Sequence, residues 1–163
     1  MSIDNLEKKL NGELPVTREE LIKLVQSWGY IKTNYEYSYK HIENVGSCYD
    51  LSRLDVSQIT DMSKLFKNSP FDGDISNWDT SHVTNMFGMF YGSTIFNSDI
   101  SKWDVSKVIT MEYMFANTKK FNQNISNWNL EKIRLCEDMF DNANAFLDKY
   151  NDGEELPYHT DHI

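Results

Sequence analysis

Trp78-Asp79-Thr80-Ser81-His82-Val83-Thr84-Asn85-Met86 is followed 25 residues later by Trp103-Asp104-Val105-Ser106-Lys107-Val108-Ile109-Thr110-Met111, and the two stretches keep one pattern. Trp128 begins a further copy at the same interval, and Leu54 holds the tryptophan position of an earlier one. A fixed period of roughly 20 to 50 residues is typical of proteins whose repeats stack, because one unit cannot bury its apolar face alone. The sequence therefore predicts a stack of about four units.

Two features inside each unit predict its local structure. A β-branched residue in polar surroundings recurs at one position and predicts a short strand that stacks in parallel on its copies. These residues are Ile59, Val83, Val108 and Ile133. The spacing Met86-x-x-Met89-Phe90, which recurs in the other units, is i, i+3, i+4 and predicts a short helix. We expect an α+β fold, namely a parallel β/α solenoid of about four 25-residue leucine-rich-like repeats with a helical N-terminal cap.

The N-terminal segment does not show the repeat and predicts two helices. Residues 4–10 form a short helix that ends at Asn11-Gly12, a typical C-terminal cap. Thr17-Arg18-Glu19-Glu20 fits a capping box at the start of a second helix, which we expect to end before Gly29. We divide the chain into a helical N-terminal cap (1–46), the repeats (47–147) and an acidic C-terminal tail or cap (148–163).

The formal net charge is −9 over 163 residues, and residues 148–163 contribute five acids and one base. An acidic chain argues against a nucleic-acid partner, because affinity for phosphates needs clustered Lys and Arg. No stretch has the roughly 18 to 20 apolar residues of a membrane span. The residues after Met1 show no secretory leader, so we expect a cytoplasmic protein. Cys136 replaces a methionine of the repeat, so we interpret it as a buried, reduced side chain.

The repeat follows the motif W-D-x-S-x-V-x-x-M-x-x-M-F, followed by F-N-x-x-I-S-x-W. This motif resembles the BspA-like leucine-rich-repeat family in its mycoplasma-type form, a domain of unknown function. The resemblance covers residues 54–147 and is closest in the second and third units. It implies a repeat scaffold with a role in adhesion or protein binding, and no catalytic residue belongs to its motif. The last unit departs from it, with Asn129-Leu130-Glu131 in place of Asp-x-Ser.

Two polar columns of the repeat allow either a catalytic or metal-binding interpretation or a structural one. Asp79, Asp104 and their copies could form a catalytic row, but Asp-x-Ser also suits a tight corner, where the carboxylate accepts a backbone N–H. Asp72-Gly73-Asp74 and its copies resemble a calcium pattern whose charge fades along the chain, which favours an Asn ladder. His159 and His162 lack a third ligand nearby. We expect no enzyme, no metal and no cofactor.

The variable columns predict a binding face, because fixed positions of a repeat build the core and changing ones meet solvent or a partner. Two such columns flank the predicted strand. The first holds Gln58, His82, Lys107 and Lys132, and the second holds Thr60, Thr84, Ile109 and Arg134. Ile109 is apolar in an otherwise polar column, which favours a partner over bare solvent. Alternating Tyr35, Tyr37 and Tyr39 offer a second candidate surface, or a strand that joins the cap to the repeats.

The sequence thus favours a non-enzymatic protein–protein interaction module, a rigid repeat scaffold that binds a protein partner through its strand face. We expect a monomer or a weak homo-oligomer, with neither nucleic acid nor membrane as partner. One alternative is a phage or mobile-element inhibitor that occludes a host protein, in which the carboxylates imitate nucleic acid. Another is a structural protein that assembles end to end.

Overall fold

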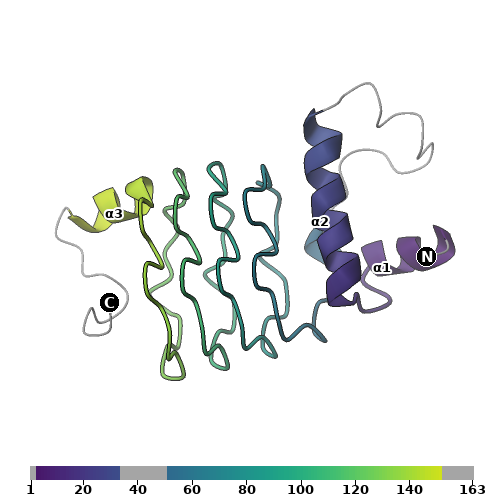
Figure 1. Cartoon of the computed structure of the whole chain (residues 1–163). Helices are drawn as coiled ribbons and strands as arrows, with labels where there is room; N and C mark the ends of the chain where they lie inside the picture. Colours follow the sequence, from purple (N-terminus) through teal and green to yellow (C-terminus); the bar gives the residue numbers. More distant parts are fainter. Residues whose placement is uncertain (1–2, 34–50, 152–163) are drawn as a thin grey trace.

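The computed structural model describes residues 3–33 and 51–151. Its elements, in chain order, are α1 (Ile3–Leu10), α2 (Arg18–Thr33), the 3-10 helix η1 (Leu51–Arg53) and α3 (Asn144–Asn151). Between η1 and α3 the chain winds as a row of coils that lie side by side, with α1 and α2 at one end and α3 at the other (Figure 1). The first coil comprises residues 54–77, the second 78–102, the third 103–127 and the fourth 128–143.

The expected parallel β/α solenoid of leucine-rich-like repeats is wrong. Within residues 3–33 and 51–151, β pairing consists of isolated parallel bridges, and none of the helices lies in the first three coils. The bridges are Pro15↔Asp55, Asp61↔Asn85, Asn85↔Thr110 and Thr110↔Leu135. The extended part of each coil is short because turns close it on both sides. In the first coil, Ile59 N–H bonds to Val56 O at 2.9 Å and Leu65 N–H to Met62 O at 3.3 Å.

Successive β-turns replace the expected short helices. In the second coil, Met89 N–H donates to Met86 O and Tyr91 N–H to Gly88 O, each at 3.1 Å. Gly88 N–H lies between these turns and donates to Glu112 O of the third coil at 2.8 Å. Positive φ angles recur at two positions of each coil, at Lys64, Asn68, Gly88, Gly92, Tyr113, Asn117, Asp138 and Asn142. A helix cannot form here, because left-handed residues interrupt it and alternate amides bond to the next coil.

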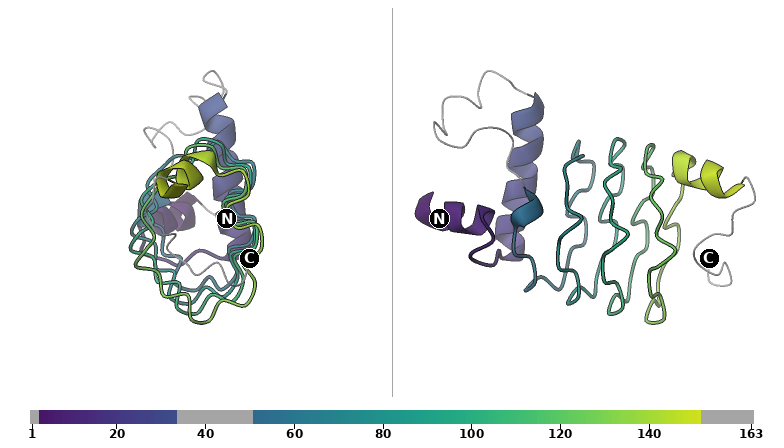
Figure 2. Two further views of the ribbon diagram at one scale, coloured as in Figure 1. Left: turned by 90° about the vertical axis from the view of Figure 1, so that its left-hand side faces the viewer. Right: turned by 180° about the vertical axis from the view of Figure 1, so that it is seen from behind.

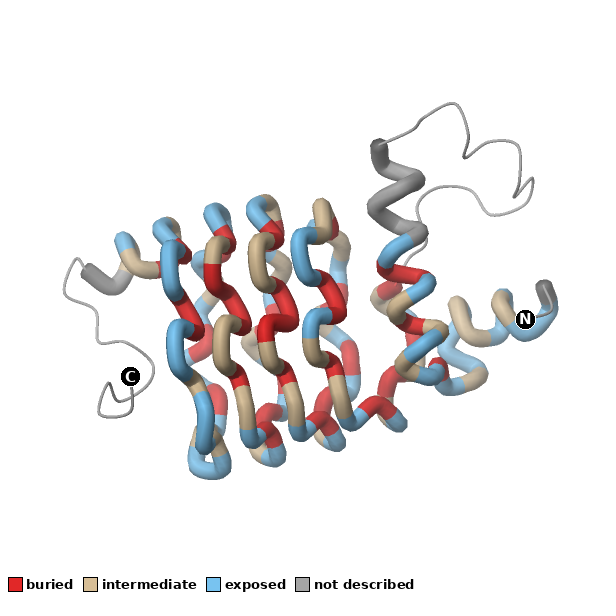
Figure 3. Tube along the Cα trace, in the orientation of Figure 1, coloured by how far each residue is buried: buried red, intermediate tan, exposed pale blue. Residues whose placement is uncertain are grey.

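Columns of stacked aromatic rings fill the interior of the coils. One column contains Phe66, Phe90, Phe115 and Phe140, with 5.2, 5.6 and 5.3 Å between successive ring centroids. A second column contains Phe96, Phe121 and Phe146, at 5.9 and 5.7 Å. Buried positions recur between exposed ones along the first three coils, which place most apolar side chains inside and polar ones outside (Figure 3). One 25-residue period of the sequence thus corresponds to one coil of the stack.

Tryptophans link consecutive coils by both packing and hydrogen bonding. The rings of Trp78 and Trp103 are parallel within 1°, with 6.4 Å between centroids. Each indole Nε1–H donates to a carbonyl of the preceding segment: Trp78 to Leu51 at 2.7 Å and Trp103 to Ile75 at 3.0 Å. The polar edge of the ring is therefore satisfied while the rest of it is buried.

The helices α1 and α2 cover the first coil. The predicted capping box is confirmed, because Thr17 N–H bonds to Glu20 Oε2 at 2.9 Å and Glu20 N–H to Thr17 Oγ1 at 3.3 Å. The prediction that Gly29 ends α2 is wrong, since the helix continues to Thr33. A glycine inside a helix costs only about 1 kcal/mol relative to alanine. Gly12 ends α1 with a φ of 75°, and a Cβ there would lie 2.4 Å from Arg53 O.

No helix in the described parts of the chain is long and apolar enough to cross a membrane. The boundaries at residues 46 and 147 stay predictions.

Candidate protein-binding face

The eight residues predicted for binding lie together along one side of the stack. The candidate face comprises Gln58, Thr60, His82, Thr84, Lys107, Ile109, Lys132 and Arg134, and every one of them is exposed. A chain of backbone hydrogen bonds crosses the coils at its second column. Thr84 N–H bonds to Thr60 O, Ile109 N–H to Thr84 O and Arg134 N–H to Ile109 O, each at 2.8 Å. These four residues are therefore direct neighbours although about 25 residues separate each pair. None of these four residues lies in a strand, so the predicted strand face is not formed by strands.

Local turns orient the side chains of the candidate face. In the third coil, Val108 N–H bonds to Val105 O at 2.9 Å, and both side chains point into the core. Lys107 and Ile109 flank Val108 and are exposed. This alternation places one residue of every column outside and its neighbour inside.

The chemistry of the candidate face changes along the stack. Its first half contains no lysine or arginine, and Thr84 Oγ1 donates to Thr60 O at 3.2 Å. Its second half surrounds Ile109, whose exposed fraction is 47%, with three cations. These cations are Lys107, Lys132 and Arg134. An apolar centre with a charged rim is the usual arrangement of a protein interface.

Leu135 is a surface residue that the sequence analysis missed. It is also 47% exposed, and its N–H bonds to Ile109 O at 3.2 Å. Ile109 and Leu135 are the large exposed hydrophobic residues within residues 4–26 and 51–149. A signal was present in the sequence, because the corresponding positions of the earlier coils hold the polar residues Asp61, Asn85 and Thr110.

The acidic column beside the candidate face has a structural role, as the corner interpretation predicts. Asp79 Oδ1 accepts Ser81 N–H at 3.0 Å, and Asp104 Oδ1 accepts Ser106 N–H at 2.9 Å. Hydrogen bonds from these serines hold the pKa of both aspartates below the ordinary value of 3.8. Asn129 Oδ1 accepts the equivalent N–H at 3.0 Å without a charge. Each carboxylate is thus engaged with the backbone of its own corner.

The column that resembles a calcium pattern is also bound to backbone. Asp74 and Asp99 close corners by accepting Ser76 N–H and Ser101 N–H at 2.8 and 2.9 Å, and these bonds lower the pKa of both carboxyls. Asn97 Oδ1 accepts the N–H of Asn122 from the next coil at 3.0 Å. The expected Asn ladder is therefore present between the second and third coils. Among the described residues, no group of three or more His, Cys, Asp or Glu is placed to hold a metal ion.

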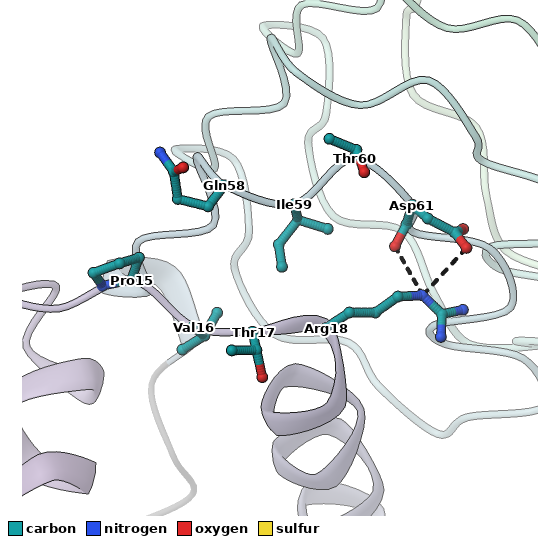
Figure 4. Close-up of a pocket in the computed structure, with 8 residues that line it drawn as sticks. All are labelled: Pro15, Val16, Thr17, Arg18, Gln58, Ile59, Thr60 and Asp61. Atoms are coloured by element: carbon teal, nitrogen blue, oxygen red, sulfur yellow. Dashed lines mark hydrogen bonds and ion pairs between the residues drawn. The ribbon is translucent and has the colours of Figure 1, made fainter.

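A shallow pocket of about 280 Å³ lies where the N-terminal segment meets the first coil. It adjoins the candidate face, since Gln58 and Thr60 line both (Figure 4). Arg18, at the start of α2, reaches across it and donates to Asp61 O at 3.0 Å. Its Nε also lies 3.4 Å from Asp61 Oδ2. This arginine is therefore used to attach α2 to the first coil.

Two other predictions concern Cys136 and residues that the structure does not describe. Cys136 is a half-buried thiol that is not part of a disulfide. Burial raises its pKa, and Glu137 and Glu112 add to the shift, so the thiol form is favoured. The tyrosine-rich segment, Cys48 and the histidines of the tail lie outside the described residues.

The geometry defines a class of protein: a stack of turn-built coils with an aromatic core and a mixed apolar and basic face. A family model described as "Mycoplasma protein of unknown function, DUF285" matches residues 33–152. The match spans most of the chain, and the chain belongs to this family. It confirms the mycoplasma-type resemblance but does not identify BspA-like leucine-rich repeats in particular. No curated protein and no solved structure matches the chain.

Proposed function

We propose that the chain is a non-enzymatic protein-binding module that holds a protein partner on its candidate face. The observation that carries the proposal is the exposure of Ile109 at the centre of a basic rim, on a side of the stack where all eight predicted residues are exposed. Leaving a large aliphatic side chain in water is unfavourable by roughly 1.5 to 3 kcal/mol relative to burying it. A partner that covers Ile109 recovers part of this free energy.

The rigidity of the coils supports the same function. The backbone under the candidate face is held between neighbours by hydrogen bonds of 2.8 Å, and the rings beneath it are stacked. A surface that is already ordered loses little conformational entropy when it binds. The resemblance of residues 54–147 to BspA-like repeats, for which adhesion and protein binding are proposed, supports this class of function as well.

The three cations define the chemistry of the partner. Lys107, Lys132 and Arg134 favour a partner surface that carries carboxylates around an apolar side chain. Acidic groups of the chain lie close by, as Asp104 and Glu131 are also exposed. The partner must therefore place its carboxylates on the candidate face itself rather than over the adjacent corner.

A matched pair of charge reversals tests the proposal. Lys107→Glu changes the candidate face, whereas Lys120→Glu makes the same change at an exposed position 13 residues further round the third coil. Each protein is immobilised and exposed to a lysate of the organism that encodes the chain, and retained proteins are identified by mass spectrometry. We expect wild type and Lys120→Glu to retain the same partner, and Lys107→Glu to bind it at least tenfold more weakly, a loss of about 1.4 kcal/mol.

A third variant, Ile109→Glu, places a charge at the centre of the candidate face and should cost more affinity than the rim change. Melting temperatures equal to wild type exclude unfolding as the cause. The proposal is wrong if all four proteins retain the same set, or if none retains a partner.

A further inference from the structure

The fourth coil exposes positions that are buried in the coils before it. In the third coil, Val105, Val108 and Met111 are all buried. Their counterparts Leu130, Ile133 and Cys136 are only partly buried. α3 covers part of this end, because Phe146 is buried against Phe121 and Phe140. The helix lies over the upper part of the coil and not over its lower part (Figure 2). Within the described residues, the fourth coil therefore ends the stack with an incompletely covered apolar edge.

The opposite end of the stack is closed. Val16 N–H bonds to Asp55 O at 3.0 Å beside the bridge of Pro15 with Asp55. Leu21 and Val25 of α2 are buried in the same core as the first coil. A second copy that offered its fourth coil would meet α2 there rather than an open coil. Among the described residues, α2 therefore stands in the way of head-to-tail growth, whereas the C-terminal ends of two copies can meet.

The charges along the edge of the fourth coil are unequal on the two sides of Leu135, with Glu131 as the one acid on the basic side. Lys132 and Arg134 precede this residue, Glu137 and Asp138 follow it, and all four side chains are exposed. In an antiparallel pairing centred on Leu135, Lys132 of one copy lies opposite Asp138 of the other. The two-fold axis repeats this pair, so the edge is complementary to itself. An isologous interface requires this kind of self-complementarity.

We propose that the edge formed by residues 130–138 is the interface of a symmetric dimer of this chain. The second copy covers Leu135 and the part-buried residues around it, and its charges neutralise those of the first. A single coil edge is small compared with the roughly 1,200 to 2,000 Å² of a stable interface, so the dimer is weak and depends on concentration. The pairing leaves Lys107 and Ile109 exposed on each copy and engages Lys132 and Arg134, the two residues of the candidate face that also belong to the edge. It does not depend on the proposed partner.

A charge-swap experiment on the full chain tests the dimer. One double variant, Lys132→Glu with Arg134→Glu, makes the edge acidic throughout. The other, Glu137→Lys with Asp138→Lys, leaves Glu131 as the one acid among the charged residues of the edge. The mass of each protein, and of an equimolar mixture of the two variants, is measured by sedimentation equilibrium over a series of concentrations. Lys107→Glu serves as the control, since it changes the candidate face but not the edge.

We expect the wild-type mass to double as concentration rises, each double variant to stay monomeric, and the mixture to recover the dimer. A wild type that stays monomeric throughout the series would overturn the proposal, as would growth beyond a dimer. A wild-type dimer that persists in both variants, without preferential pairing in the mixture, would assign the contact to another surface. Unchanged dimerisation of Lys107→Glu, together with its loss of partner binding, separates this interface from the candidate face.

Discussion

At the scale of single residues, each corner of a coil needs a side-chain oxygen that accepts a backbone N–H, and this oxygen need not carry a charge. Asp79 and Asp104 accept a serine N–H, and Asn129 accepts the equivalent N–H at a similar distance. Asparagine also closes a corner at Asn85, which accepts Phe87 N–H at 3.0 Å. The repeat can therefore exchange the two residue types while it keeps the turn.

The pKa values of the corner aspartates predict how the stability of the fold depends on pH. The pKa of Asp79 and of Asp104 is lower in the folded chain, so both carboxylates stabilise the fold above the ordinary value of 3.8. That contribution is lost as the pH falls through the lowered pKa. The double variant Asp79→Asn with Asp104→Asn should be slightly less stable than wild type at pH 7, because it lacks the contribution of the charge, and should lose less stability on acidification below about pH 4. Urea unfolding at a series of pH values measures the difference.

Asp79→Ala is the control, because it removes the acceptor at every pH and should cost about 1 kcal/mol even at pH 7. An asparagine variant that is as destabilised as the alanine variant at pH 7 would show that the charge itself holds the corner.

At the scale of the coil, the sequence predicted the register and the core but not the secondary structure. The 25-residue period places Phe90 over Phe115 and Trp78 over Trp103, as the structure shows. The spacing Met86-x-x-Met89-Phe90 was misassigned as helical, because successive β-turns place apolar side chains inward at the same intervals.

Part of that error could have been avoided. Gly92 and Asn117 adopt positive φ, as glycine and asparagine often do. Lys64 and Tyr113 adopt positive φ as well, which their residue types do not suggest. Bonds to the next coil hold them there, since Lys64 N–H donates to Phe87 O at 2.9 Å and Tyr113 N–H to Glu137 O at 3.1 Å. Such contacts arise only once the coils have stacked, so local sequence patterns do not predict them.

The stacking of the coils predicts a graded effect of tryptophan removal. Trp103 lies in the middle of the stack, parallel to Trp78 and within 6.2 Å of the Phe90 ring. Trp103→Ala should destabilise the fold by about 3 to 5 kcal/mol, because it leaves a cavity and removes one of the two hydrogen bonds that Ile75 O accepts. Trp128→Ala, in the incompletely covered fourth coil, should cost less. Urea unfolding gives both values, and equal effects or a small one at Trp103 would contradict the stacking account.

At the scale of the whole molecule, three surfaces have different roles. α1 and α2 close one end of the stack, the described residues cover the other end only in part, and the candidate face runs along the side. The eight residues of that face could be predicted from the sequence because repeat columns separate variable positions from fixed ones. The uncovered edge could not be predicted in this way, since it depends on where the stack ends, although the column of Leu135 is polar in the earlier coils.

The central claim is that the candidate face contacts a protein partner, and site-specific photocrosslinking tests it most directly. A photoreactive amino acid replaces Thr84, which lies beside Ile109 on the candidate face, or Thr94, an exposed threonine elsewhere on the second coil. After irradiation in the native lysate, the account predicts one discrete adduct from position 84 and none from position 94. No adduct from position 84, or the same adducts from both positions, would contradict it.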